Sequence, residues 1–436
     1  MDESLLMDRD IVLVIPQYRL GILGFLRTPG GATGGNMGML DQLAALKWVQ
    51  DNIVTFGGDP NHVILAGEDA GGASAIYHML SPLSEGLFHG VISMSGAPIA
   101  PWAIMQREHR FNLMLANFVQ CPAYDPKLMV QCFQEIELFA ELLNGTQMLM
   151  EGRDPVMGNC KIAPAVQDRH LVHETTLFIP EHPLQLLSEG KFHKIPVMMG
   201  VTKDVGGYLV DMLFYDFMLF KLELDPDFLK ELLPMLLKEC DVRDPKSHEE
   251  EFADFYFPGK TFDDLPELLP GLMNLLGDVH FKTSILSTAK LLADHVPTRV
   301  YRYEYEGGPH LFDVRYPDRT SAPPMPDAVG HGDEMALLLP EGEYEYTPDQ
   351  KVMSEKLLDA IENFVYGKLD EQTWPLFKAE RLDTLVWGHD GSTSVEPFDT
   401  SERLKMLESL HNYHHDKIIQ SMKEALEAAE TTHDEL

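Results

Sequence analysis

The sequence predicts an α/β protein whose large, mostly parallel sheet is flanked by helices, and two patterns predict it. Residues 11–15 form a β-branched apolar run bounded by polar residues and Pro16, which is typical of a strand buried on both faces. Residues 63–66 form a second such run, and a glycine-bounded turn joins it to a helical pattern at 73–80 and a short strand at 91–94. Strand, helix and strand in this order describe a β-α-β crossover.

The rest of the chain extends the same plan. Apolar residues at helical spacing predict helices at 40–54 and 349–366. Strands are expected at 195–199 and 300–305, and residues 104–290 are otherwise mostly helical in pattern. These helices are expected to supply a cap and insertions around the sheet.

The domain organisation is simple, because the chain has no internal repeat, low-complexity tract or convincing linker. Residues 1–400 are expected to form one domain that lacks N-terminal strands, for a reason given below. Residues 401–436 are expected to form a helix with one apolar stripe, followed by an acidic tail.

Composition excludes several classes of function. The 436 residues are 44% hydrophobic, which is enough for a substantial core, and the formal charge of -35 disfavours nucleic acid as a partner. No run approaches the roughly 20 apolar residues that a membrane span needs. The four cysteines form no CxxC pair, so the sequence predicts no metal centre and no other cofactor.

The chain ends in His433-Asp434-Glu435-Leu436, an HDEL tetrapeptide of the kind that returns soluble proteins to the endoplasmic reticulum. The acidic first residues do not resemble a signal peptide. The expected location is nevertheless the endoplasmic reticulum lumen or the secreted fraction, with an entry signal in sequence upstream of this chain.

A sharp turn is predicted where the strand at 63–66 meets the following helix. Gly67-Glu68-Asp69-Ala70-Gly71 matches the spacing of the G-x-S-x-G nucleophile elbow, with Asp69 at the serine position. The central residue of such an elbow is strained and projects its side chain at the sheet edge, while the glycines let strand and helix pass closely.

The residues around this turn are similar to those of the carboxylesterase and cholinesterase family, the type-B carboxylesterases. The similar segments lie at 36–42, 45–53, 56–60, 87–90, 200–204, 330–334 and 374–377. The resemblance implies an α/β-hydrolase fold. In that family a serine attacks the ester, a histidine takes its proton and a glutamate orients the histidine.

Carried over residue by residue, the resemblance puts Asp69 at the serine position, Val205 at the glutamate position and His331 at the histidine position. A carboxylate cannot become an alkoxide, and a valine cannot accept a hydrogen bond from imidazole. Ordinary serine-esterase chemistry is therefore not expected.

The resemblance also implies a loss in the oxyanion hole. Of its backbone donors only the N–H of Ala70 is expected here, because the family's glycine-rich loop and its strand precede the part of the family sequence that this chain matches. That strand would lie between the strands at 11–15 and 63–66. Either these two strands close up or the sequence is an incomplete copy of a longer protein, and incompleteness is the expectation.

Three functions remain open. The first is a catalytically inactive binding module for an unknown small apolar ligand or protein partner. The second is a carboxylic ester hydrolase whose sequence was imperfectly determined at Asp69 and Val205. The third is a hydrolase of the epoxide or haloalkane type with Asp69 as nucleophile, which needs a carboxylate beside His331 and could find it in Asp204 only after a shift in loop register.

Smaller features concern the secretory pathway. The resemblance implies a disulfide between Cys121 and Cys132, with Cys160 and Cys240 as free thiols. Asn144-Gly145-Thr146 is a glycosylation sequon that would be used only after translocation. His411, His414 and His415 are read as a solvated helix face rather than as metal ligands.

Overall fold

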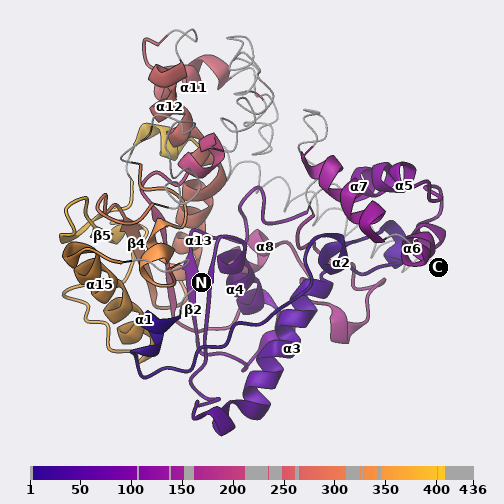
Figure 1. Ribbon diagram of the computed structural model, residues 1–436, viewed down its shortest axis with the longest axis horizontal. Helices are drawn as coiled ribbons and strands as arrows, with labels where there is room; N and C mark the ends of the chain where they lie inside the picture. The colour runs from indigo at the N-terminus through magenta and orange to yellow at the C-terminus, as the bar shows by residue number, and fades with distance from the viewer. Residues whose placement is uncertain are drawn as a thin grey trace.

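The structure is a computed structural model that describes residues 3–105, 108–136, 139–151, 162–211, 234, 248–260, 265–310, 325, 328–340, 345–399 and 401–407. Its centre is a six-stranded sheet in the order β1-β2-β3-β4-β5-β6, with parallel pairing throughout except for the antiparallel pair β5 and β6 (Figure 1). The strands are β1 Ile64–Glu68, β2 Gly90–Met94, β3 Val197–Thr202, β4 Thr298–Tyr303, β5 Asp383–Trp387 and β6 Thr393–Pro397.

Helices account for most of the remaining described chain. The α-helices are α1 Ser4–Met7, α2 Gly21–Phe25, α3 Met37–Asn52, α4 Ala70–Leu80, α5 Glu108–Phe118, α6 Pro126–Glu135, α7 Phe139–Glu151, α8 Pro183–Ser188, α11 Glu249–Tyr256, α12 Leu265–Gly277, α13 Thr283–Ala293 and α15 Pro348–Val365. Shorter turns are η1 Pro29–Gly31, η2 Ile53–Phe56, η3 Pro82–Ser84, η4 Glu174–Thr176 and η7 Asp333–Leu337, and η6 Asp278–Lys282 is a π-helix.

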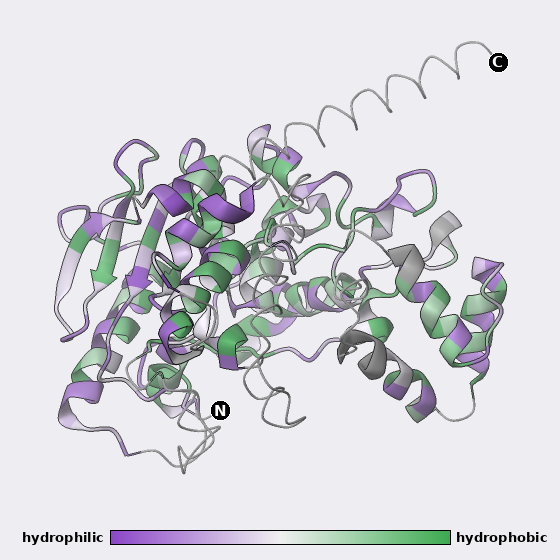
Figure 2. Cartoon of the chain, turned by 90° about the horizontal axis from the view of Figure 1, so that it is seen from above, coloured by the Kyte–Doolittle hydropathy of each residue, from purple (hydrophilic) through white to green (hydrophobic). Residues whose placement is uncertain are grey.

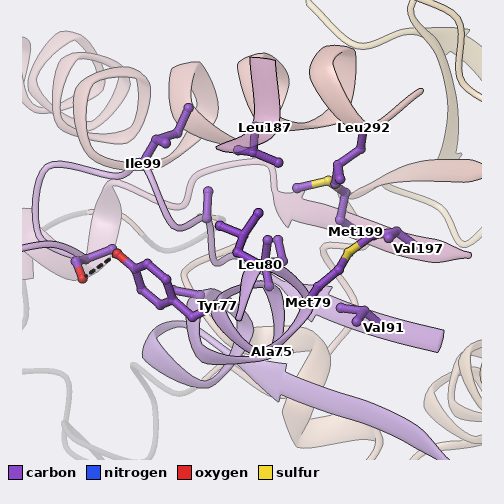
Figure 3. Packing of buried hydrophobic residues seen from close by; sticks show 14 of the residues in the cluster. Ala75, Tyr77, Met79, Leu80, Val91, Ile99, Leu187, Val197, Met199 and Leu292 are labelled. Carbon is purple, nitrogen blue, oxygen red and sulfur yellow. Dashed lines mark hydrogen bonds between the residues drawn. The ribbon is translucent and has the colours of Figure 1, made fainter. Parts of the chain in front are cut away.

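One face of the sheet packs against α4, α8 and α13. Figure 3 shows this core, in which Met79 and Leu80 of α4 meet Met199 of β3 and Leu292 of α13. Tyr77 of the same helix is fully buried, and its hydroxyl lies 2.8 Å from the carbonyl of Pro98 and 3.0 Å from that of Ala103. Apolar packing therefore covers this face of the sheet, and the buried Tyr77 hydroxyl has hydrogen-bond partners.

The opposite face packs against α15, which begins with a capping box formed by Thr347 and Gln350. The N-terminal segment joins this core through Leu6. Arg9 fastens the same segment to α15 through ion pairs with three carboxylates spaced along one side of the helix: Glu355, Asp359 and Glu362.

Most of the predicted elements are confirmed. Strands form at β1, β2, β3 and β4, and helices at α3, α4 and α15, within a few residues of the expected bounds. The strands β5 and β6 were not predicted. The predicted terminal helix is described only at 402–407, and the rest of it, with the HDEL tetrapeptide, Cys160, Cys240 and the three late histidines, lies outside the described residues.

The prediction of a strand at residues 11–15 is wrong. The segment has no strand hydrogen bonding, although it keeps the alternation of a strand: Ile11 and Leu13 pack on the α15 core, while Val12 and Val14 are exposed. An apolar alternating run becomes a strand only when a neighbour offers hydrogen bonds. The two flanking segments therefore do not close up, and within the described residues β1 is an edge strand.

Helices α5, α6 and α7 group away from the sheet in Figure 1, around a small apolar core that Ile22 of α2 also joins. Figure 2 shows green and purple stretches side by side on these helices, as expected where each buries one side. The expected disulfide between Cys121 and Cys132 is present here. Asn144 lies exposed on α7, whereas Thr146 is buried and its hydroxyl donates to the carbonyl of Leu142 at 2.8 Å.

Candidate functional site

The turn between β1 and α4 has the geometry that the sequence predicts. Asp69 adopts φ 53° and ψ −118°, a strained conformation for a residue with a side chain, and its backbone N–H donates to Met94 of β2 at 2.8 Å. A Cβ atom on Gly67 would come within 2.2 Å of the backbone of Gly71. Glycine is thus required at position 67, and the Asp69 side chain makes no capping hydrogen bond to the helix that it precedes.

Asp69 and His331 lie together, as the resemblance implies. Nε2 of His331 is 3.4 Å from Oδ1 of Asp69 and 3.0 Å from Oε1 of Glu68. The His331 side chain is 9% exposed, and the rings of Phe281 and Tyr208 lie 4.8 and 5.5 Å away from it. A buried imidazole thus faces two adjacent carboxylates.

This arrangement keeps His331 charged. Burial alone would lower its pKa, but the contacts with Asp69 and Glu68 outweigh burial and raise the pKa to about 10. A histidine that acts as a general base must be neutral near the working pH. An imidazolium held between two carboxylates cannot accept a proton.

Val205 is part of the core rather than of the site. Its side chain is fully buried in the apolar cluster that includes Val201 and Phe281. Nδ1 of His331 has no hydrogen-bond partner among the residues that the structure describes. The residue at the position that the resemblance assigns to an orienting glutamate therefore has no side-chain group that could accept a hydrogen bond from His331.

Asp204 does not replace the missing orienter. Its carboxylate accepts a hydrogen bond from the backbone N–H of Val329 at 3.0 Å, so it supports the loop that leads to His331 rather than the imidazole itself. Burial raises the pKa of Asp204. The shift in loop register that an Asp69 nucleophile would need is not present in this structure.

Two acidic residues of the site were missed at the sequence level. Glu68 is the ion-pair partner described above, and Glu334 is a buried carboxyl whose Oε1 accepts from the Tyr301 hydroxyl at 3.2 Å. Burial, helped by the charge of Glu68, raises the pKa of Glu334 to about 8, so this carboxyl is mostly protonated at neutral pH. Both residues stand inside the segments that carry the family resemblance, at 67–71 and 330–334, and that was the available signal.

The remaining site predictions concern the oxyanion hole and metals. Ala70 is the first residue of α4, so its backbone N–H has no partner within the helix. In the described part of the chain no cluster of histidine, cysteine and carboxylate side chains could hold a metal ion. None of the described helices is both long and apolar enough to cross a bilayer.

Comparison with known proteins decides the family. The model of the carboxylesterase family matches residues 1–411. The chain belongs to the carboxylesterase family. It is 31% identical over 377 residues to a rat protein described as pyrethroid hydrolase Ces2e, and the match covers 85% of this chain and 60% of the relative. A mouse acylcarnitine hydrolase is 32% identical over 371 residues, covering 83% of this chain and 60% of the relative.

A human cocaine esterase is also similar, at 30% identity over 383 residues, covering 85% of this chain and 62% of the relative. The chain thus spans about 60% of the length of these carboxylesterase-family relatives. The mostly parallel sheet with helices on both faces agrees with the α/β-hydrolase fold that the resemblance implies.

Proposed function

We propose that this carboxylesterase-family chain does not hydrolyse esters by the serine route and acts as a binding module. The observation that carries the proposal is the ion pair of His331 with Glu68 and Asp69 at 3.0 and 3.4 Å. The elbow carries no hydroxyl, and its histidine is held as a cation. Acyl transfer needs a nucleophile and a neutral base, and Asp69 and His331 do not supply them at the described elbow.

The ligand is proposed to be a small apolar molecule with an ester or acyl group, with a protein partner as the alternative. Three relatives have names that describe hydrolysis of pyrethroids, acylcarnitines and cocaine. A scaffold that keeps the elbow and loses the chemistry could retain such a molecule without cleaving it. That step rests on the likeness of fold and sequence.

Hydrolysis of a p-nitrophenyl ester, with and without a serine-directed organophosphate, tests the proposal. The expected rate equals that of the His331→Gln variant and is unaffected by the organophosphate. An organophosphate-sensitive rate would favour the ester hydrolase instead, as would resequencing that returned serine at position 69. Binding of a non-hydrolysable ester analogue, followed by calorimetry, separates a ligand module from a protein-binding one.

A second function has one observation in its favour, the approach of Oδ1 of Asp69 to Nε2 of His331. In that mechanism the Asp69 carboxylate attacks an alkyl carbon and forms an ester, while a halide leaves as an anion or an epoxide C–O bond opens and its oxygen takes a proton from water. A second water then gives a proton to neutral His331 and attacks the ester carbonyl, which releases the alcohol and the Asp69 carboxylate. The charged state of His331 weighs against this mechanism, as does the absence of a described partner at Nδ1. Turnover of an epoxide in heavy-oxygen water would label the Asp69 peptide if the mechanism operates, and an unlabelled peptide would exclude it.

We also propose that the protein is made as a longer chain in the secretory pathway. The edge of β1 that has no neighbouring strand among the described residues supports a further strand, and the disulfide between Cys121 and Cys132 supports an oxidising compartment. Mass spectrometry of the native protein tests both points, since it would detect peptides upstream of Met1 and a sugar on Asn144. Detection of neither in protein from its native source would contradict the proposal.

A further inference from the structure

A π-helix lies beside the candidate site and joins α12 to α13. Its residues, Asp278–Lys282, are all buried. Turns of this kind are rare in proteins and persist where surrounding contacts hold them. The contacts that stabilise this π-helix therefore also fix the positions of the residues that pack against the π-helix.

The π-helix contacts His331 of the candidate site, and the residue before it contacts the core residue Val205. The ring of Phe281 packs on His331 with centroids 4.8 Å apart. Gly277, the residue before the π-helix, lies so close to Val205 that a Cβ atom on it would be 3.2 Å from Cγ1 of the valine. A shift of the π-helix would therefore move the packing of His331 and of Val205 together.

Three side chains from other elements contact the π-helix: Trp102, Arg403 and Tyr256, whose hydroxyl donates to Oδ2 of Asp278 at 3.0 Å. Trp102 donates its indole N–H to the carbonyl of His280 at 2.9 Å. The carboxylate of Asp278 is fully buried, and its Oδ2 accepts from Arg403 Nε at 2.7 Å. Within the π-helix, Lys282 Nζ lies 3.8 Å from the other oxygen of Asp278.

Arg403 comes from the end of the described chain, residues 401–407, far from the π-helix in sequence. Leu404 and Leu407 of the same segment are buried in two different apolar clusters. A buried carboxylate that loses its guanidinium partner becomes an incompletely compensated charge. Docking of the C-terminal segment is therefore coupled to compensation of the negative charge of Asp278.

We propose that Arg403 is a positioning residue, and that docking of the C-terminal segment sets the position of His331 through the pair of Arg403 with Asp278 and the π-helix. The path consists of direct contacts: Arg403 to Asp278, the π-helix to Phe281, and Phe281 to His331. Release of the C-terminal segment would loosen the π-helix and with it the ring that packs on the imidazole. The position of His331 is thus coupled to residues 401–407.

Hydrogen exchange of the full chain, followed by mass spectrometry, tests the coupling with Arg403→Gln. The expected result is roughly tenfold faster exchange in peptides covering 277–286 and 328–335. The matched control is Arg381→Gln, which breaks the 2.7 Å ion pair between the exposed Arg381 and the partly buried Asp383 and should leave both peptides unchanged. Arg403→Lys should restore most of the protection.

Titration of His331 distinguishes a positioning role of Arg403 from a purely structural one. In a histidine-labelled sample, with the signal assigned through His331→Gln, Arg403→Gln should change the His331 pKa and Arg381→Gln should not. If Arg403→Gln does not fold, Asp278→Asn with Arg403→Gln removes both charges, and it should fold with an altered His331 titration. Faster exchange confined to 401–407, with an unchanged titration in either variant, would overturn the proposal.

Discussion

The residues that follow β1 and β3 differ in a way that bears on the whole site. Asp69 follows β1 with a side chain that is 41% exposed, and its carboxylate pairs with His331. Val205, just after β3, is fully buried among apolar neighbours. The resemblance assigns a catalytic residue to each position, yet only the first is still occupied by a group that contacts His331.

The comparison shows that the departures from the family at Asp69 and at Val205 are not equally reversible. The elbow keeps its backbone geometry, so a change at Asp69 alters charge and leaves packing alone. Position 205 has become part of the core and lies close to Gly277, so a polar side chain there must displace apolar neighbours. The predictions below test this contrast.

Val205→Glu should have the largest effect, because it buries a carboxylate in a closely packed apolar cluster. The expected loss in the free energy of unfolding is about 3 kcal/mol or more, measured by urea denaturation. Val395→Glu, at a position of β6 that is 42% exposed, is the control and should change stability by less than about 0.5 kcal/mol. An undiminished stability of Val205→Glu would mean that the carboxylate reaches Nδ1 of His331, and the contrast would be lost.

The pH dependence of stability should show the ion pair at the elbow. The folded pKa values of His331, about 10, and Glu334, about 8, both lie above their ordinary values. The folded state therefore holds protons that the unfolded state has released, and stability falls as pH rises through this range. The melting temperature should fall between pH 6 and pH 10, more steeply for the native chain than for His331→Gln or Glu334→Gln. Equal slopes in all three would contradict the assignment.

Asp69→Asn and Glu68→Gln should each lower the His331 pKa, since each removes one of the facing charges. With both substitutions burial dominates, and the pKa should fall below its ordinary value of about 6.5. Titration of the labelled histidine measures this. Both substitutions together should also lower stability at neutral pH, because the raised pKa of His331 stabilises the folded state there. A single variant that leaves the pKa at its native value would show that the imidazole faces another charge.

Asp69→Ser should have the smallest effect. The variant restores a hydroxyl at the elbow, but His331 would still face Glu68 and would still lack an orienting carboxylate at Val205. The expected ester hydrolysis is no greater than that of the native chain. A rate increase of a hundredfold or so would show that the elbow alone was limiting.

Local sequence determined what could be predicted about the elbow. The glycines around Asp69 predicted the turn, because the close passage of strand and helix excludes a side chain at Gly67. The neighbourhood of Asp69 and His331 followed from the resemblance. The role of Glu68 did not, because whether a strand residue beside the elbow turns toward the histidine depends on the tertiary position of residues 328–332.

The wrong and missing elements have a common physical reason. Residues 11–15 carry the pattern of a strand without a hydrogen-bonding neighbour, whereas Asp383–Trp387 becomes β5 because β4 lies beside it. The π-helix at Asp278–Lys282 has no local signature, since contacts from Trp102 and Arg403 hold it. Pairing and distant contacts are not visible in a window of sequence.

The placement of Thr146 has a consequence for the order of events during biosynthesis. The Thr146 hydroxyl is buried and donates a hydrogen bond to the carbonyl of Leu142. An oligosaccharide-transferring enzyme therefore could not bind the Asn144-Gly145-Thr146 tripeptide once α7 has formed. Any sugar on Asn144 would have to be attached while the nascent polypeptide is still emerging. The fraction of molecules that carry the sugar would then depend on the rate of sugar transfer relative to the rate at which α7 folds.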